Sequence, residues 1–374
     1  MKVLYVLEYY YPHVGGVETL FKELAEGCVQ HGHQARVITA SLGNTPSKEY
    51  INGVEIIRLN VPRIGRRYWF TILAFFPLFK HIAGFNIIHT TTYNAALPAW
   101  LVAVLTRKKI ILTVHEVWGT LWYSFVGGKN IINVLHRFFE WFILKLPFDF
   151  YVTDSDYTEK ALLKLRKTNL KTSRIYPGID NDFFNPGNYS KDKIRSQYYQ
   201  RNDFVCLFFG RPGWAKGVDY LVNSFSIVSK HIKGAKLLLL LSKDPYSRYQ
   251  EIVSLISRLN LSGSVRVISS VPRNELPEYI ASADCVVIPS LAEGFGFSAA
   301  EASAMEVPLV ATDVGSLPEV VSGKVVFSPS AHSEALAQAI LSMHAGQYTV
   351  LPKKKFVWSD SVGQYVSIYS NLAT

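Results

Sequence analysis

Short runs of apolar, β-branched residues alternate along the chain with longer segments in which apolar positions recur at helical spacing. This alternation is typical of parallel strand–helix–strand units rather than of hairpins. Because the strand-like runs are apolar throughout, we expect sheets that helices cover on both faces. In the first half, the pattern predicts a helix over about 17–31 and strands at 2–9, 34–40, 54–60, 86–90, 109–116 and 148–155.

The pattern restarts after residues 174–192, which are rich in turn-forming and charged residues. A chain of 374 residues is also too long for one ordinary core. We therefore predict an α/β protein with two Rossmann-like, doubly wound domains that face each other across a cleft, with candidate ligand-binding residues directly after strands. The expected domains are 1–175 and 185–356, with a helix over about 357–374 packing back on the first; second-half strands are expected at 203–211, 235–242, 264–271, 284–290, 307–313 and 323–328.

The composition adds a basic charge, since 39 lysines and arginines against 29 acidic residues give a net charge of +10. That excess predicts attraction to phosphates on nucleic acid, on anionic lipid or on a nucleotide ligand. The sequence has no concentrated stripe of lysine and arginine and no recognised RNA- or DNA-binding motif, so a nucleic-acid partner is the least favoured of the three.

The cysteines and the apolar segments bear on the compartment. Cys28, Cys206 and Cys285 lie far apart in apolar runs, which predicts buried thiols in a reducing compartment rather than a zinc cluster or a disulfide framework. The first twelve residues lack the cleavage site of a signal peptide. The longest charge-free apolar segment, 68–79, is shorter than the roughly 20 residues of a spanning helix. We therefore expect a cytoplasmic protein.

The loop GRPGWAKG, residues 210–217, follows a predicted strand and leads into a helix that begins at about Val218. Arg211 and Lys216 flank this loop. Two cations beside the free N–H groups of a helix N-terminus make a suitable site for a pyrophosphate. The alternative is a pair of solvated surface cations.

Gly15 and Gly16 stand at the corresponding place after the first strand, in PHVGGVETL. Without side chains, they would let another group approach the backbone closely. A Gly-Gly pair is more often only a turn, and the spacing does not fit the three-glycine dinucleotide motif.

The stretch EGFGFSAAE, residues 293–301, places Glu293 in a loop after a strand and Glu301 near the start of a helix, with Ser298 as the expected cap. Carboxylates accept paired hydroxyl hydrogens, which suits a sugar or a ribose. The glycines of the loop would expose N–H groups to the same ligand. The alternative is that Glu301 stabilises its own helix and Glu293 is a surface turn residue.

Taken together and in this order, these motifs resemble the large retaining glycosyltransferase family with the two-domain GT-B fold, called family 4. EGFGFSAAE is similar to the family's motif of two glutamates separated by seven residues, and GRPGWAKG to its Gly-Arg and Lys-Gly pattern. The resemblance spans nearly the whole chain, through PHVGGVE, TVHE, YPGIDNDFFNP, VIPS and ATDVGSLPE.

The resemblance implies roles for individual residues. Arg211 and Lys216 would hold the diphosphate of the donor, and Glu301 would bind its ribose. His115 would lie beside the transferred sugar, although a single histidine at a strand end is more often a structural hydrogen-bonding residue. The catalytic set would be His115, Glu293, Arg211 and Lys216; the donor-binding set would be Gly15, Gly16, Arg211, Lys216, Val271, Glu293, Gly294, Phe295, Gly296, Phe297 and Glu301.

The implied reaction retains the configuration of the sugar and uses no protein nucleophile. Fixed cations would stabilise the departing nucleoside diphosphate, whose phosphate would take the acceptor's proton. The resemblance implies neither a cofactor nor a metal. Residues 242–244 replace a Gly-acid-Gly turn that is usual in the family, so the base of the donor, UDP or GDP, stays open.

Two segments of the first half bear on the acceptor. Residues 61–82 combine Arg63, Arg66 and Arg67 with an aromatic, apolar run, and residues 133–148 form a second helix of that kind. Such segments suit adsorption to an anionic membrane. They also suit helices that only cover a core, and the net charge favours the membrane slightly. We expect a lipid-linked or envelope glycan acceptor; a catalytically silent GT-B subunit and a nucleic-acid-binding protein remain the alternatives.

Overall fold

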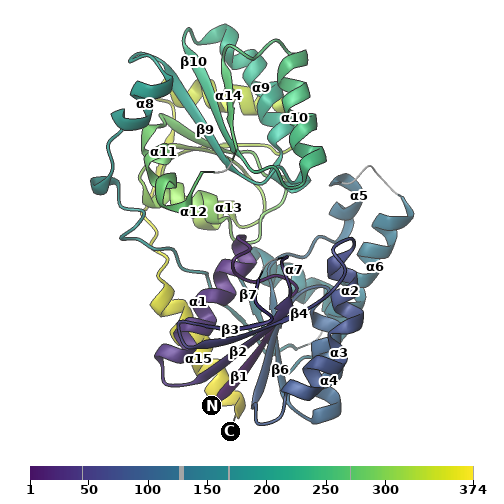
Figure 1. The fold of residues 1–374 in the computed structure, drawn as a ribbon. Coiled ribbons are helices and arrows are strands. Elements are labelled where there is room, and N and C mark those ends of the chain that lie inside the picture. Colours follow the sequence, from purple (N-terminus) through teal and green to yellow (C-terminus); the bar gives the residue numbers. More distant parts are fainter. Residues whose placement is uncertain (44, 126–129, 167–168, 270, 374) are drawn as a thin grey trace. The chain divides into compact units, whose positions relative to one another are not determined.

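The computed structural model describes residues 1–374 apart from 44, 126–129, 167–168, 270 and 374. The chain forms two compact units, which are described separately below (Figure 1). The first unit consists of Met1–Gly178 together with Val357–Thr374, and the second of Ile179–Phe356.

The first unit is built on one twisted sheet with the strand order β3-β4-β2-β1-β5-β6-β7-β8. All neighbouring strands are parallel except β3 and β4. The chain leaves β1 toward β2 on one side and returns to β5 on the other, so the strand order reverses between β1 and β5. The strands are β1 Lys2–Val6, β2 Gln34–Ala40, β3 Lys48–Ile51, β4 Val54–Leu59, β5 Ile87–Thr91, β6 Lys109–Val114, β7 Phe150–Thr153 and β8 Thr172–Arg174.

Helices cover both faces of this sheet, with α1 and α15 on one side and α2, α3 and α4 on the other (Figure 1). The strand period of two explains the division, because Leu4 and Val6 pack in one core and Val3 and Tyr5 in the other. The helices are α1 Gly16–Gln30, α2 Arg66–Leu73, α3 Phe75–His81, α4 Ala96–Thr106, η1 Gly119–Leu121, α5 Trp122–Phe125, α6 Ile131–Lys145, α7 Asp156–Arg166 and α15 Trp358–Ala373.

The last helix, α15, belongs to the first unit. Gly27 on α1 makes its close approach possible, because a Cβ there would lie 2.6 Å from Cγ1 of Val362. Tyr365 and Tyr369 of α15 are fully buried. The hydroxyl of Tyr369 lies 2.7 Å from Nδ1 of His89, whose Nε2 lies 2.8 Å from the hydroxyl of Thr113. A buried polar network therefore fixes α15 on the sheet.

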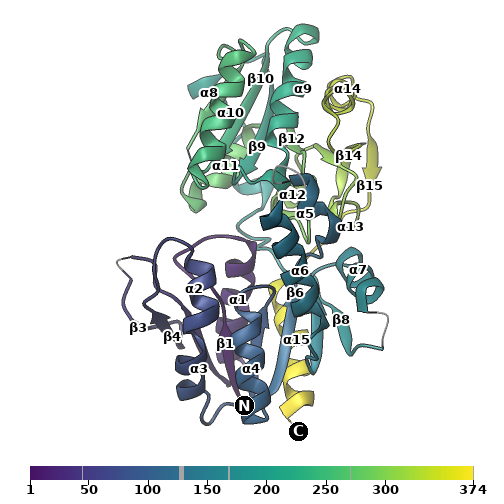
Figure 2. The same cartoon turned by 90° about the vertical axis from the view of Figure 1, so that its right-hand side faces the viewer.

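The second unit repeats the doubly wound design with the strand order β11-β10-β9-β12-β13-β14-β15. The pairs are parallel except β14 with β15, which lie at the edge of the sheet beside α14 (Figure 2). The strands are β9 Phe204–Gly210, β10 Ala235–Leu241, β11 Val265–Ile268, β12 Cys285–Ile288, β13 Leu309–Thr312, β14 Gly323–Ser328 and β15 Thr349–Leu351.

A core of aliphatic side chains lies between this sheet and α9, α10 and α14. Cys206 and Cys285 are buried thiols in it, and Cys28 is buried in the first unit. The helices are η2 Pro186–Asn188, α8 Asp192–Tyr198, η3 Trp214–Lys216, α9 Val218–His231, α10 Tyr246–Arg258, η4 Arg273–Glu275, α11 Leu276–Ser282, α12 Phe297–Ala304, α13 Leu317–Val320 and α14 Ser333–His344.

The predicted α/β fold with two doubly wound sheets is confirmed. The expectation of parallel units without hairpins is wrong at one edge, where β3 and β4 form an antiparallel hairpin. The second sheet also has an antiparallel edge pair, β14 with β15, but α14 lies between these strands in the sequence. The β3–β4 connection consists of Asn52 and Gly53, both with positive φ. An Asn-Gly pair of this kind is a strong signal for a two-residue hairpin turn.

Candidate functional site

The main candidate site lies where the strand order of the second unit reverses. From β9 the chain turns to β10 on one side, and β12 pairs with β9 on the other. Loops that leave neighbouring strands at such a point diverge and leave room for a ligand at their carboxyl ends. The loop after β9 carries Arg211 and Lys216, and the loop after β12 carries Glu293.

These two loops are fixed to each other by their backbones. The N–H of Leu291 donates to the carbonyl of Ala215 at 2.7 Å. Gly217 adopts the left-handed conformation with φ of 61°, and a Cβ there would lie 2.1 Å from the carbonyl oxygen of Pro289. Only glycine fits at this position, which is also the N-terminal cap of α9.

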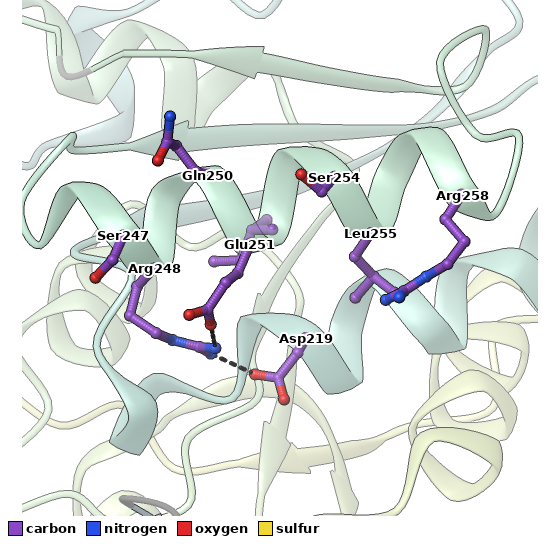
Figure 3. A pocket seen from close by; sticks show the side chains of 9 residues that line it. Asp219, Ser247, Arg248, Gln250, Glu251, Ser254, Leu255 and Arg258 are labelled. Atoms are coloured by element: carbon purple, nitrogen blue, oxygen red, sulfur yellow. Dashed lines mark hydrogen bonds and ion pairs between the residues drawn. The ribbon is translucent and has the colours of Figure 1, made fainter.

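A cation–π contact between Arg248 and Trp214 supports the loop after β9. The guanidinium carbon of Arg248 lies 3.4 Å from the ring centre of Trp214. Arg248 is buried and forms ion pairs with Asp219 at 3.1 Å and with Glu251 (Figure 3). The same side chains line a surface pocket of about 560 Å³ along α10, and none of the predicted site residues lines it.

Lys216 and Glu293 form a direct ion pair. The Nζ atom of Lys216 donates to both carboxylate oxygens of Glu293, at 2.9 and 2.8 Å, and the hydroxyl of Ser290 donates to Oε2 at 2.9 Å. Glu293 is 9% exposed. The alternative in which Glu293 is a surface turn residue is therefore wrong: it is a buried, fully paired carboxylate.

The backbone around Glu293 is held by the loop after β13. Ser316 donates its N–H to the carbonyl of Glu293 at 3.1 Å and its hydroxyl to that of Phe295 at 2.8 Å. A Cβ at Gly315 would lie 2.2 Å from the carbonyl oxygen of Glu293. Gly294, Phe295 and Gly296 are buried in this turn, and Gly296 has φ of 91°.

Arg211 differs from Lys216 in having no partner. Its side chain is exposed, and among the described residues no hydrogen bond or ion pair involves it. It therefore offers a free guanidinium at the carboxyl end of β9, in the same loop as Lys216. Such a group suits a bidentate interaction with a phosphate.

Glu301 lies on α12 and is 3% exposed. Nη2 of Arg273 donates to its Oε1 at 2.7 Å. Burial raises the pKa of Glu301 and the charge of Arg273 lowers it, with the net result above the ordinary value. The expected cap of this helix is wrong: Gly296 caps α12, because its left-handed conformation ends the turn there, and Ser298 donates instead to the carbonyl of Phe209.

The two remaining donor-side positions flank this region. Phe297 begins α12, and its ring lies 5.1 Å from that of Phe295. Val271 is half-buried in the segment between β11 and η4. Neither contacts the carboxylates of Glu293 and Glu301 through a hydrogen bond, as expected for apolar side chains.

Gly15 and Gly16 lie at the N-terminus of α1 in the first unit. Gly15 is its cap, with an extended backbone at φ of −167°. Any residue could adopt that conformation, so the glycine is not required by its backbone angle. The first turn also carries Glu18, which pairs with Nδ1 of His13 at 2.9 Å.

His115 follows β6 and is held by Asp154, which follows the neighbouring strand β7. The Nδ1 atom of His115 lies 2.5 Å from Oδ2 of Asp154, and the Nε2 atom is buried without a partner among the described residues. Burial lowers the pKa of His115, but the carboxylate of Asp154 raises it, and the net shift is upward. An unpaired buried ring nitrogen is unusual and points to a ligand.

Several residues of these sites were not identified from the sequence. Asp154 directly follows β7 and Ser290 lies two positions after β12, so the rule that selected Glu293 could have selected them too. Arg273 gave no signal beyond being one of 39 basic residues. In the part of the chain that the structure describes, no group of three or more histidine, cysteine or acidic side chains is arranged to hold a metal ion.

Comparison with known proteins gives two matching family models: Glycosyltransferase Family 4 over residues 14–183 and Glycosyl transferases group 1 over residues 203–345. An uncharacterized glycosyltransferase of Methanocaldococcus jannaschii is 27% identical over 339 residues, covering 87% of this chain and 84% of its own. The GPI3 subunit of phosphatidylinositol N-acetylglucosaminyltransferase from Saccharomyces cerevisiae is 21% identical over 390 residues, covering 98% and 82%.

Solved structures show the same fold. Sucrose-phosphate synthase from Thermosynechococcus elongatus has a TM-score of 0.80 at 22% identity, covering 99% of this chain and 98% of that one. Anabaena HepE in complex with UDP-glucose has a TM-score of 0.73 at 18% identity, covering 100% and 98%. The fold is thus shared along the whole chain at low sequence identity.

Proposed function

Since the chain belongs to the family 4, or group 1, glycosyltransferases and is an enzyme of the GT-B type, we propose that it transfers a sugar from a UDP- or GDP-linked donor to a lipid-linked or envelope glycan at a membrane surface. Configuration at the transferred carbon is retained. Arg211, Lys216, Glu293 and Glu301 bind the donor.

The observation that carries the donor assignment is the placement of Lys216, Glu293 and the free Arg211 at the reversal point of one sheet. Arg211 and Lys216 bind the diphosphate, and Glu293 accepts hydrogen bonds from hydroxyls of the transferred sugar. The complex of Anabaena HepE with UDP-glucose supports a nucleotide sugar as the donor. When the donor binds, the diphosphate oxygens accept hydrogen bonds from Lys216 and the sugar hydroxyls donate to Glu293, so each side chain exchanges its present partner for one from the donor.

The same residues account for catalysis. As the bond between sugar and diphosphate breaks, negative charge grows on the departing oxygen, and the fixed cations Arg211 and Lys216 stabilise it. No protein nucleophile takes part, and the departing phosphate accepts the proton of the acceptor hydroxyl. His115, with its free Nε2, donates or accepts a hydrogen bond at the transferred sugar, and the N–H groups at Gly15 and Gly16 meet the phosphates. These first-unit roles follow from the family resemblance.

The acceptor assignment rests on the surface of α2, α3 and α6. The helices cover a core through Phe70, Leu78 and Ile143, yet large apolar side chains on them face solvent. Tyr68 and His136, joined at 2.8 Å, place α2 beside α6. The exposed apolar residues on these helices are Tyr68, Trp69, Ile72, Leu73, Phe76, Phe79, Ile131, Ile132, Val134, Leu135, Phe138, Trp141 and Phe142, and Ile64 is exposed just before α2.

Basic residues stand among these apolar side chains. Arg63, Arg67 and Arg137 are exposed, and Lys80 lies in the last turn of α3. Apolar side chains interspersed with cations complement an anionic lipid surface, where each nearby cation contributes about 1 kcal/mol. The described helices include none with the length and apolar character that crossing a membrane requires. The yeast relative named for phosphatidylinositol supports a lipid-borne acceptor.

A thermal-unfolding screen with UDP-sugars and GDP-sugars tests the donor. Protection by one of them, followed by its hydrolysis and by transfer to a lipid-linked acceptor from a panel, is the expected result. Protection without hydrolysis or transfer would indicate a catalytically silent binding subunit. A protein that ignores every nucleotide sugar but binds nucleic acid would overturn the proposal.

Co-sedimentation with vesicles tests the membrane surface. The chain should bind vesicles that contain anionic lipid, release them at high salt, and lose binding in the variant Phe76→Ser, which alters a side chain that is 78% exposed. Val350→Ser in the second unit is the matched control, because Val350 is 68% exposed on β15. Equal binding by both variants would remove α3 from the proposal.

A further inference from the structure

The carboxylate of Glu301 is held by a single side chain among the described residues. Among the described residues, Arg273 is the one hydrogen-bond donor to it, from Nη2 to Oε1 at 2.7 Å. Arg273 lies on η4, between β11 and α11, and belongs to none of the motifs that carry the family resemblance.

The two partners differ strongly in burial. Glu301 is 3% exposed on α12, whereas the side chain of Arg273 is 53% exposed. The guanidinium carbon of Arg273 lies 4.9 Å from the ring centre of the buried Phe184, which supports it from one side. The arginine can therefore reach solvent, while the carboxylate cannot. A ligand that reaches Glu301 from the solvent side meets Arg273 first.

The charge balance at Glu301 depends on the same contact. Burial raises the pKa of Glu301, and Arg273 opposes that effect through its charge and its hydrogen bond. α12 packs against β12, β13 and α13, whose titratable residues are Cys285 and Glu319; neither shifts the pKa of Glu301. Without Arg273, the buried carboxyl would hold its proton to higher pH.

Protonation would change what Glu301 can bind. An ionised carboxylate accepts hydrogen bonds at both oxygens and suits the two neighbouring hydroxyls of a ribose. A protonated carboxyl keeps one oxygen as a hydrogen-bond donor and cannot accept both hydroxyls in the same way. Whether Glu301 can accept both ribose hydroxyls therefore depends on the group that keeps its carboxylate charged.

We propose that Arg273 is a positioning residue for the nucleoside end of the donor: it holds the Glu301 carboxylate charged and in place until the ribose hydroxyls bind there. The inference rests on the proposed function, in which Glu301 accepts those hydroxyls. It assigns to Arg273 a role in setting the pH range over which the donor binds.

Calorimetric titration with UDP and GDP between pH 5.5 and 9 tests the proposal on the full chain. The variants are Arg273→Met, which keeps an apolar stem over Phe184, and Arg273→Lys, which keeps the charge. Arg266→Met is the matched control, because Arg266 is also exposed and lies 4.9 Å from the ring centre of Tyr198 without reaching Glu301.

For Arg273→Met, we expect nucleotide affinity to fall about tenfold at pH 6 relative to the unaltered chain, since one pKa unit corresponds to a factor of ten. The gap should close as pH rises and Glu301 becomes ionised in both proteins. Arg273→Lys and Arg266→Met should follow the unaltered chain. The unaltered chain should bind a 2′,3′-dideoxy nucleotide more weakly than UDP. Arg273→Met at pH 6 should bind the dideoxy nucleotide and UDP equally well.

An Arg273→Met affinity loss that is the same at every pH would overturn the proposal, because it would reflect lost packing alone. Unchanged affinity at pH 6 would overturn it as well. Failure of the unaltered chain to bind any nucleotide would instead overturn the proposed function, and this inference with it. The two failures are thus distinct. If Arg273→Met does not fold, an affinity loss at low pH in Arg273→Lys, which keeps the charge, would overturn the proposal.

Discussion

Lys216 and Glu293, which are 77 positions apart in the sequence, share two hydrogen bonds of 2.9 and 2.8 Å. The pair lies where β9 and β12 adjoin, so each loop contributes one charge to the same place. Each side chain is neutralised by the other. A donor that carries both hydroxyl and phosphate groups can separate Lys216 from Glu293. Its phosphate would then replace Glu293 as the partner of Lys216, and its hydroxyls would replace Lys216 as the partner of Glu293.

Lys216→Ala and Glu293→Gln should each lower sugar transfer by a factor of about 10² to 10³, the usual cost of removing one group that stabilises transition-state charge. Steady-state rates with the identified donor provide the measurement, and circular dichroism should show an unchanged fold. Lys193→Ala is the matched control, since Lys193 forms an exposed ion pair with Glu278 on the same unit. Near-normal rates in both site variants would refute the site assignment.

Asp154→Asn should lower the pKa of His115. In the unaltered chain the folded pKa of His115 exceeds its ordinary value. The protonated ring therefore stabilises the fold below the ordinary pKa, and this contribution disappears as pH rises through the folded pKa. The stability difference between the unaltered chain and Asp154→Asn should be larger at pH 5.5 than at pH 9.

Urea unfolding and NMR titration of the histidine ring measure this effect. Asp156→Asn is the control, because Asp156 pairs with Arg174 at the surface two positions away. A difference that is independent of pH would show that the carboxylate of Asp154 does not act on the charge of His115.

Gly217→Ala should destabilise the second unit by about 1–3 kcal/mol, the range for a substitution that combines left-handed strain with a steric overlap. The new Cβ would lie 2.1 Å from the carbonyl oxygen of Pro289. Gly213→Ala, in the same loop, has no atom within 4 Å of the new Cβ and should change the unfolding free energy by less than about 0.5 kcal/mol. Equal stability of the two variants in urea would contradict the geometry.

His89→Gln should make stability less sensitive to acid. Burial, aided by His115, lowers the pKa of His89 to about 3. The unfolded chain therefore binds a proton that the folded chain rejects, and stability is lost as pH falls below the ordinary pKa toward 3. The loss is about 1.4 kcal/mol per pH unit.

Urea midpoints between pH 7.5 and 4.5 give the slopes. The slope of the unaltered chain should exceed that of His89→Gln, whereas His231→Gln, an exposed change on α9, should follow the unaltered chain. Parallel slopes for the unaltered chain and His89→Gln would show that His89 does not remain neutral.

Much of the fold followed from the apolar pattern, because buried parallel strands are nearly continuous in apolar residues. Strand β2 was predicted at its observed bounds, as was β14. The edge strands β3, β8 and β15 were missed since they are short and half-exposed, so their sequences carry little apolar signal. Only the Asn-Gly turn before β4 could have revealed β3.

The candidate site was predictable as a set of strand-end residues but not as a set of contacts. That Lys216 pairs with Glu293 depends on which strands are neighbours, and that Glu301 pairs with Arg273 depends on the path of a loop. The cap of α12 was misassigned because a serine is a common cap, whereas here the left-handed Gly296 ends the preceding turn.

The return of α15 to the first unit has a consequence for synthesis on the ribosome. Residues 179–356 are contiguous, so they can complete their core as soon as they have emerged. The N-terminal part emerges earlier but lacks Tyr365 and Tyr369 until residues 358–373 have emerged. The first unit thus acquires its finished interior after the second, and a nascent chain that stalls before α15 has emerged would leave the surface of α1 and the ring of His89 uncovered.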